Sequence, residues 1–96
     1  MKIEDVIYNR NGSIHIQPGR YGGGWICLVA LDEYDIETVF ESFWDLTAGD
    51  NEYFQARDSF RAKENCILVE YAESPEDALR IALREALAIF EKENRE

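Results

Sequence analysis

The sequence contains no long hydrophobic run, and its longest uninterrupted apolar stretch is the seven residues Trp25–Leu31. A helix that spans a bilayer needs about 20 such residues, so we expect no membrane-spanning segment. The first residues, Met1–Asp5, also lack the basic and apolar regions of a secretory signal. The sequence therefore predicts a cytoplasmic protein with no membrane partner.

Cysteine and histidine are scarce, at two residues and one residue. Cys27 and Cys66 each lie in an apolar run, where a reduced, buried thiol is the usual state. They form no metal-ligand spacing, and one histidine is too few for a common zinc site, so no metal is expected. His15 has no recognisable nucleophile or paired acid, and we interpret it as an exposed structural histidine. The sequence predicts no catalytic residue and no cofactor.

Basic residues are few compared with acidic ones. Ten Lys and Arg oppose 20 Asp and Glu, which gives a net charge of -10 and a pI near 4.5. Proteins that bind nucleic acid directly do so largely by neutralising phosphates with Lys and Arg. We therefore expect no direct binding to nucleic acid, and the acidic charge favours a basic partner.

The composition is that of a folded protein. With 96 residues, 46% of them hydrophobic and 12% aromatic, the chain can close one core, so we expect a single domain over 1–96. The expected class is α+β, an antiparallel β-sheet of four to five strands with two helices packed on one face. The expected elements are strands at 3–8, 13–17 and 25–31, a helix at 35–48, a loop at 49–58, a hairpin at 60–72 and a helix from Ser74 to Phe90.

Local signals support these expectations. Asn9–Gly12 carries the Asn-Gly pair of a tight hairpin turn, and Ser13–Gln17 alternates apolar and polar residues as a strand with one buried face does. Ser74 and Pro75 resemble an N-cap followed by the first helical position. The helix that follows has an apolar stripe at Leu79, Ala82, Leu83, Ala86, Leu87 and Phe90. The polar tail Glu91–Glu96 should fray.

The acidity is concentrated in one segment. The 21 residues Asp32–Glu52 contain eight acids and no Lys or Arg, so they carry -8 of the net -10. Within it, Glu37, Glu41 and Asp45 follow i, i+4, i+8 spacing, which puts three like charges in one row of the expected helix. Such pairs destabilise a helix by about 0.2–0.5 kcal/mol each. A helix shaped only for stability would mix the signs.

Two interpretations of this acidic segment stay open: a solvated face that keeps the protein soluble, or a surface for a basic partner. Successive i, i+4 carboxylates rise by about 6 Å, a spacing of the same order as neighbouring phosphates, so mimicry of nucleic acid is geometrically feasible. Aromatic neighbours could anchor such an interface. The candidate partner-binding residues are Asp32, Glu33, Tyr34, Asp35, Glu37, Glu41, Asp45, Asp50, Glu52 and Tyr53.

The glycine-rich stretch Gly19–Gly24 is a weaker candidate. It lacks the Gly-Lys-Ser/Thr ending of a phosphate-binding loop and precedes a strand in place of a helix. We therefore expect a flexible connection, in which Arg20 and Tyr21 could still touch a partner. If the acidic row is only solvated, the interface is expected around Arg20, Tyr21 and the pair Tyr53 and Phe54.

Two stretches resemble the HicB antitoxin family. Ile14–Pro18 followed by Gly22–Val29 is similar to that family's opening hairpin, with glycines before an aromatic strand. Glu73–Phe90 is similar to the helix that packs across its sheet. The resemblance therefore lies within residues 14–29 and 73–90. The expected acidic helix interrupts it, and no DNA-binding tail follows.

In size, acidity and lack of recognisable catalytic residues, the chain is also similar to small phage-encoded inhibitors of defence nucleases, including anti-CRISPR proteins. Both resemblances imply a protein that blocks another protein acting on nucleic acid. We therefore expect a non-enzymatic inhibitor of a basic nucleic-acid-binding protein or nuclease complex, of the anti-CRISPR or anti-restriction type. The alternatives are an antitoxin or immunity protein against a nuclease toxin, and a small enzyme or ligand-binding domain that uses Gly19–Gly24. The oligomeric state stays open, a homodimer included.

Overall fold

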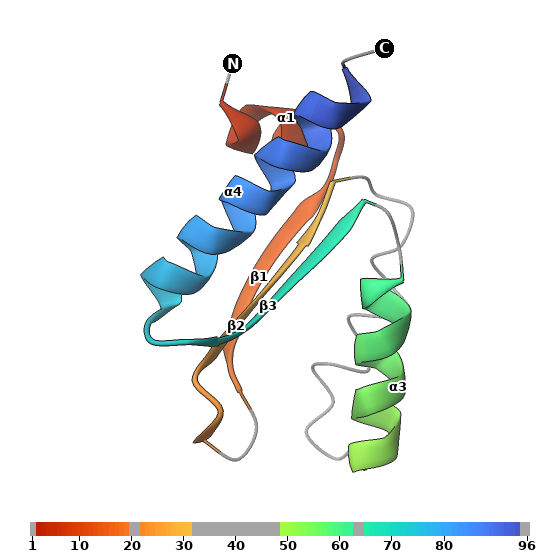
Figure 1. Cartoon of the computed structure of the whole chain (residues 1–96), viewed down its shortest axis with the longest axis vertical. Helices are drawn as coiled ribbons and strands as arrows, with labels where there is room; N and C mark the ends of the chain where they lie inside the picture. The colour runs from red at the N-terminus through yellow and green to blue at the C-terminus, as the bar shows by residue number, and fades with distance from the viewer. Residues whose placement is uncertain (1, 20–21, 32–48, 63–64, 95–96) are drawn as a thin grey trace.

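The computed structural model describes residues 2–19, 22–31, 49–62 and 65–94 (Figure 1). The helix expected at 35–48 lies outside these residues. The elements in the described ranges are α1 (Ile3–Asn9), β1 (Ser13–Pro18), β2 (Trp25–Ala30), α3 (Asp50–Arg61), β3 (Cys66–Ala72) and α4 (Pro75–Glu93).

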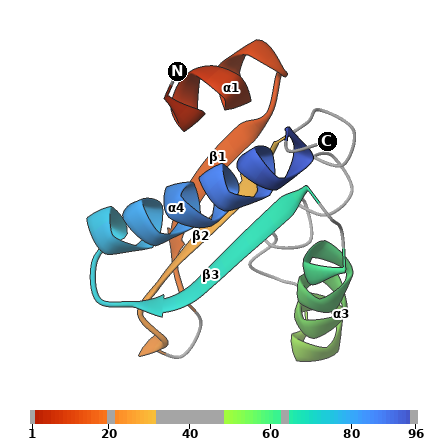
Figure 2. The same cartoon turned by 45° about the horizontal axis from the view of Figure 1, so that its top comes forward.

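The strands form one antiparallel sheet with helices on both of its faces. Their order is β1-β2-β3, with β2 in the centre as its unbroken apolar sequence predicted. Side chains of α1 and α4 share one core with residues such as Cys27 and Val29, whereas Tyr53 and Phe60 of α3 share another with Ile26 and Leu28. Figure 2 shows α4 crossing the strands on its side of the sheet.

The expected fold class is therefore wrong in two respects. The described residues contain a sheet of three strands, where four to five were expected. Their helices do not pack on a single face, because α1 and α4 cover one face and α3 covers the other. The broader class, α+β, is correct.

The segment predicted as a strand at 3–8 forms the helix α1. Its buried residues are Ile3, Val6 and Ile7, whose i, i+3, i+4 spacing places them on one helical face. The Asn-Gly signal ends this helix and does not make a hairpin turn. Asn11 has φ 57°, and the Gly12 N–H donates to the Ile7 oxygen at 2.8 Å, a hydrogen bond typical of a helix C-terminus.

The loop predicted at 49–58 and the hairpin predicted at 60–72 are also wrong. Residues Asp50–Arg61 form α3, and only Cys66–Ala72 form a strand, β3. Tyr53 and Phe60 lie seven residues apart, so two turns of helix place both against the sheet, where they are 5% and 0% exposed. The polar residues between them gave this helix the appearance of a loop.

Strand β1 is found where it was predicted, but its apolar face is not covered. Ile14 and Ile16 are 36% and 37% exposed, more than His15, the residue between them. They pair with Val29 and Cys27, so they lie on the face that carries α4. Because β1 is at the edge of the described sheet, α4 lies mainly over β2 and β3 and leaves these isoleucines partly exposed.

The C-terminal helix α4 confirms its start signal. Ser74 is the N-cap, its Oγ accepts a hydrogen bond from the Asp77 N–H at 3.1 Å, and Pro75 opens the helix. The most deeply buried row is made of small residues, Ala78, Ala82 and Ala86, each 0% exposed. Small side chains let the helix axis approach the sheet closely, and the leucines of the predicted stripe lie at its flanks.

The end of α4 differs from the prediction. The helix was expected to end at Phe90 but continues through Glu93. Glu93 forms an ion pair of 3.1 Å with Arg10, the residue that ends α1. This contact joins the ends of the two helices that share a face of the sheet.

Candidate functional site

Most of the predicted partner-binding residues lie outside the described residues. They are Asp32, Glu33, Tyr34, Asp35, Glu37, Glu41 and Asp45. The backbone of Asp50 and Glu52 belongs to the first turn of α3. The residues on either side of 32–48 are described: the buried Leu31 donates its N–H to the Asn65 oxygen at 2.9 Å, and Gly49 is the N-cap of α3.

Tyr53 has a different environment from the one expected of an interface anchor. Its side chain is 5% exposed and packs in the core between α3 and the sheet. Its ring meets the Phe54 ring edge to face, with centroids 5.6 Å apart. Phe54, at 42% exposed, is the member of this pair that solvent reaches.

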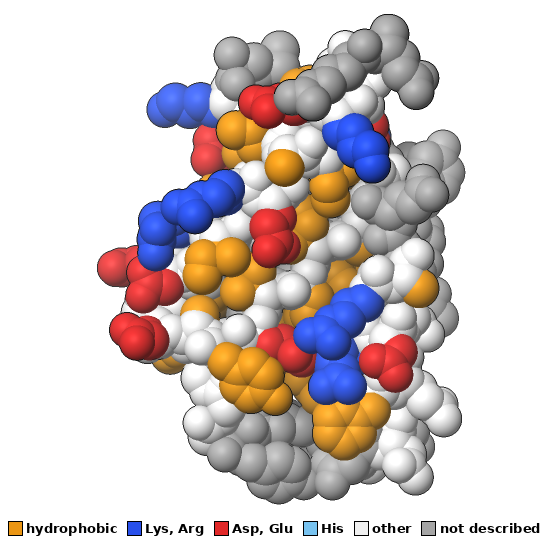
Figure 3. Space-filling view, in the orientation of Figure 1, with side chains coloured by type: hydrophobic (Ala, Val, Ile, Leu, Met, Phe, Trp, Pro, Cys, Tyr) orange, Lys and Arg blue, Asp and Glu red, His pale blue; other side chains and the backbone are white. Residues whose placement is uncertain are grey.

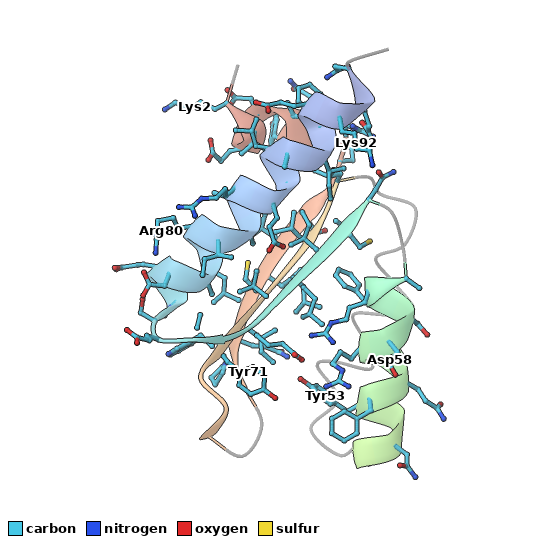
Figure 4. All side chains as sticks on the ribbon, viewed as in Figure 1. Lys2, Tyr53, Asp58, Tyr71, Arg80 and Lys92 are labelled. Atoms are coloured by element: carbon cyan, nitrogen blue, oxygen red, sulfur yellow. The ribbon has the colours of Figure 1, made fainter. Side chains whose placement is uncertain are left out.

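A pocket of about 90 Å³ lies beside these two rings, where α3, β3 and the β1–β2 connection meet. Figure 4 shows Tyr53 of α3 and Tyr71 of β3 at this end of the molecule. The pocket brings together the glycine-rich stretch and the pair Tyr53 and Phe54, the two regions named as the alternative interface if the acidic row is only solvated. Arg20 and Tyr21 themselves lie outside the described residues. Its lining residues are Gly19, Gly23, Ile26, Tyr53, Phe54, Arg57, Glu70 and Tyr71.

A β-bulge in β3 shapes one wall of this pocket. Trp25 pairs with Ala72 and Cys27 pairs with Val69, so Ile26 of β2 is opposed by two residues, Glu70 and Tyr71. In a regular strand two successive side chains point to opposite faces. Here Glu70 and Tyr71 both line the same pocket. Bulges commonly redirect side chains in this way beside functional sites.

Tyr71 adopts a backbone conformation that is costly for its residue type. Its φ is 62°, in the left-handed region that glycine and asparagine prefer, and its side chain is 74% exposed. Such a residue costs on the order of 1–3 kcal/mol and is kept only where its surroundings impose it. Tyr71 lies in the bulge, so the strained backbone and the irregular strand pairing both occur at the wall of the pocket.

Gly24 allows the β1–β2 connection to approach this bulge. Its φ is 79°, and a Cβ atom there would lie 2.7 Å from the Ala72 oxygen and 3.1 Å from the Tyr71 Cα. A side chain at this position is therefore disfavoured both by conformation and by space. Gly22, with φ 72°, has open space around it.

The side chain of Glu70 is 10% exposed, and its carboxylate lies beside two arginines of α3, Arg57 and Arg61. Arg61 Nη2 donates to Glu70 Oε2 at 2.7 Å, a short charge-assisted hydrogen bond. Arg57 Nη1 lies 3.9 Å from Glu70 Oε1, beyond hydrogen-bonding distance. Glu70 is thus neutralised chiefly by Arg61.

Arg57 is held in place mainly by an aromatic ring. Its guanidinium carbon lies 4.8 Å from the centroid of the Phe54 ring, a cation–π distance. Its Nε is buried and has no hydrogen-bond acceptor among the described residues, and it lies 3.6 Å from Asp58 Oδ1. An arginine so loosely bonded at the wall of a pocket has donors to offer a ligand.

The other candidate groups lie elsewhere. His15 of β1 pairs with Leu28 and is half-buried, whereas it was expected to be exposed. This burial lowers the pKa of His15. Cys27 is 0% exposed and burial raises the pKa of its thiol to about 11, so it stays protonated at neutral pH. Cys27 is buried as predicted, whereas Cys66 is only half-buried, and the two are not joined by a disulfide.

Within the described ranges, no three or more His, Cys, Asp or Glu side chains gather in a way that could hold a metal ion. Over the same ranges, no helix has the length and apolar character needed to cross a membrane. Comparison with protein-family models, with curated proteins and with solved structures finds no match to this chain. The resemblance to HicB antitoxins and anti-CRISPR proteins accordingly stays an expectation.

Arg57, Glu70 and Tyr71 were not predicted as site residues from the sequence. Arg57 was missed because 49–58 was interpreted as a loop, although Tyr53, Arg57 and Phe60 have the i, i+4, i+7 spacing of one helical face. Tyr71 has no signal of its own in the sequence, because the residue with positive φ in a bulge is usually glycine. The run Cys66–Tyr71 therefore reads as a regular strand.

Proposed function

We propose that this protein is a non-enzymatic inhibitor that binds a basic nucleic-acid-binding protein, most simply a defence nuclease complex in the cytoplasm, through its acidic segment Asp32–Glu52. The observation that carries the proposal is the eight acids without a single Lys or Arg over 21 residues. Such a segment attracts a basic, phosphate-binding surface and speeds association with it. It acts in this proposal as a mimic of the nucleic-acid backbone.

The remaining charges support this proposal by contrast. Outside the segment, acids and bases are mixed, and many of them pair in the described residues: Arg80 with Asp77 at 3.2 Å, and Arg10 with Glu93 at 3.1 Å. The acids of the segment have no base within it to pair with. Charge of one sign kept together at a local cost in repulsion is typical of an electrostatic binding surface.

The alternative function is that of an antitoxin or immunity protein for a nuclease toxin, because such a protein would use the same acidic surface against the same kind of basic site. The two differ in which nuclease is inhibited. They make the same prediction for the role of the acidic residues.

The test is inhibition of nucleic-acid cleavage. Purified restriction endonucleases, CRISPR effector complexes and ribonuclease toxins are assayed with the parent protein and with the triple variant Glu37→Lys, Glu41→Lys, Asp45→Lys. The matched control is Glu73→Lys, Glu85→Lys, Glu91→Lys, which makes the same charge change at exposed positions beside and along α4. Circular dichroism checks that each variant folds.

We expect the parent and the control to inhibit one of these nucleases and the segment variant to lose inhibition, because attraction becomes repulsion. If the parent inhibits none of them, or if the folded segment variant inhibits as well as the parent, the proposed function is wrong.

A further inference from the structure

The pocket beside the β3 bulge is not used by the proposed function, which relies on the acidic segment. We propose that this pocket binds a small, flat, uncharged ligand whose edge carries a hydrogen-bond acceptor next to a donor, as in an aromatic carboxamide or a lactam. The proposal goes beyond the proposed function and needs none of the acids of the segment. Three observations support it: the balance of charge, the spacing of Arg57 and Glu70, and the aromatic walls.

The first observation is that charges at the pocket are balanced. The described lining carries one positive charge, on Arg57, and one negative charge, on Glu70. Outside the lining, Asp58 lies within 4 Å of Arg57 and Arg61 within 4 Å of Glu70, which adds one charge of each sign. Figure 3 shows basic, acidic and hydrophobic side chains adjoining one another on this face, between α3 and the sheet. A charged ligand would leave one charge uncompensated in a partly buried place, whereas a neutral ligand would not.

The second observation is the unfilled contact between Arg57 and Glu70. Both residues line the pocket, yet Arg57 Nη1 and Glu70 Oε1 are 3.9 Å apart. A hydrogen bond between such groups is shorter, at about 2.7–2.9 Å. The wall therefore presents a donor next to an acceptor, neither satisfied by the other. A carboxamide or lactam edge presents the complementary acceptor and donor.

Glu70 can accept from such a ligand without losing its existing partner. Its second oxygen, Oε2, already receives the 2.7 Å bond from Arg61 Nη2. Arg57 is likewise fixed by the Phe54 ring and not by Glu70. A ligand that lays its edge across the two groups gains two hydrogen bonds and breaks none that the described residues make between them.

The third observation is the aromatic character of the walls. Ile26 is buried behind the pocket, and the rings of Phe54 and Tyr71, 42% and 74% exposed, stand at its rim. A mostly apolar pocket with a few convergent polar groups is the usual form of a small-molecule site. Its volume, about 90 Å³, admits the head group and part of a ring, so the rest of the ring would lie against the rim aromatics.

The irregular backbone around the pocket is typical of a binding site. The bulge turns Glu70 and Tyr71 toward it, Tyr71 accepts φ 62°, and Gly24 lets the neighbouring connection come close. These departures from regular sheet geometry bring polar and aromatic side chains to one place. Strained backbone of this kind concentrates at binding sites.

The test compares four probes of nearly the same shape: benzamide, which is neutral with donor and acceptor, benzoate, an anion, benzamidine, a cation, and acetophenone, which lacks the donor. Each is titrated into the full chain, and binding is followed by amide chemical shifts in ¹H–¹⁵N spectra. We expect benzamide to bind most tightly, with shifts at Ile26, Phe54, Arg57, Glu70 and Tyr71. Loss of one hydrogen bond should make acetophenone bind about tenfold more weakly than benzamide.

Two variants test the residues. Arg57→Gln removes the charge-assisted donor and should weaken benzamide about tenfold. Phe54→Leu removes an exposed rim ring and should also weaken it, whereas the matched control Tyr8→Leu, at an 83% exposed position on α1, should leave the affinity unchanged. Chemical denaturation of each variant confirms that it is folded at the temperature of the titration.

Several outcomes would overturn the proposal. Tighter binding of benzoate would make this an anion site of Arg57, and tighter binding of benzamidine would make it a cation site of Glu70. Binding of none of the probes, shifts centred outside the pocket, or an Arg57→Gln variant that binds benzamide like the parent would each contradict it as well. All of these outcomes are independent of whether the acidic segment inhibits a nuclease.

Discussion

Gly24 and Tyr71 lie so close that a Cβ atom on Gly24 would be 3.1 Å from the Tyr71 Cα. Both residues have positive φ, 79° and 62°, so two unusual backbone conformations meet at the wall of one pocket. The contact joins the β1–β2 connection to the bulge of β3. The shape of the pocket therefore depends on a glycine that the sequence presents as part of a flexible stretch.

The first prediction concerns this glycine. Gly24→Ala should destabilise the protein more than Gly22→Ala, because both have positive φ but only Gly24 lacks room for a methyl group. The conformational cost is about 1–2 kcal/mol for either variant, and crowding should add about 1–3 kcal/mol at Gly24. Urea denaturation of the two variants measures the difference. Equal stabilities would show that the connection does not approach the bulge as described.

The second prediction concerns the small residues under α4. Ala82→Leu should destabilise the protein by about 1–3 kcal/mol, because a leucine at a 0% exposed position would push the helix away from the sheet. Ala88→Leu is the matched control on the exposed side of the same helix and should change stability by less than about 0.5 kcal/mol. Thermal and urea unfolding of both variants measure this. An Ala82→Leu variant as stable as the control would contradict the close packing of α4.

The third prediction concerns the reactivity of Cys27. Its thiol has a pKa of about 11 in the folded protein against the usual 9.0, so about a hundredfold less thiolate is present near pH 8. Alkylation of native Cys27 by iodoacetamide should be at least that much slower than in the urea-unfolded protein, since the side chain is also 0% exposed. Mass spectrometry of the Cys66→Ser variant gives the rate at Cys27 alone. Rapid native alkylation would contradict the buried position.

The fourth prediction is a pH dependence from His15. Burial lowers the pKa of His15 below 6.5, so below pH 6.5 the unfolded state binds more protons at this site than the folded state. Stability is therefore lost as the pH falls from 6.5 toward the lowered pKa. His15→Gln should reduce this loss, seen as a flatter dependence of urea stability between pH 7 and pH 5. The same slope in parent and variant would assign the loss to other groups.

Some of this fold was predictable from the sequence, and the physical reason is the same in each case. Trp25–Ala30 is an unbroken apolar run and is the central strand, and Ser74 with Pro75 begins α4. These signals arise from chemistry within a few residues. They do not depend on what the segment later packs against.

The errors arose where a local signal has two structural solutions. Asn11 and Gly12 supply positive φ and a close approach equally well in a hairpin and at a helix C-terminus, and here they end α1. Ile3, Val6 and Ile7 form too short a pattern to distinguish a helix from a strand without their partners in the core. Ile14 is partly exposed because α4 does not cover it, and the position of α4 over the sheet cannot be predicted from a local pattern.

The pocket could not be predicted because it depends on tertiary contacts. Its residues come from three segments of the chain, and the bulge that gathers Glu70 and Tyr71 opposite Ile26 is a property of how β2 and β3 align. The acidic segment is the reverse case. Its charge is evident from the sequence alone, and its role is a prediction that only binding measurements can test.

The most direct measurement of the central claim is the salt dependence of binding to the nuclease that the protein is proposed to inhibit. Affinity is measured at about 50 mM and about 200 mM salt for the parent and for the neutral variant Glu37→Gln, Glu41→Gln, Asp45→Gln. Gln keeps the approximate shape of these side chains and removes three charges. The account predicts that the parent loses affinity steeply with salt and that the variant binds more weakly and with a flatter dependence. Equal affinities and equal salt dependences for the two folded proteins would show that the acidic row is only a solvated face.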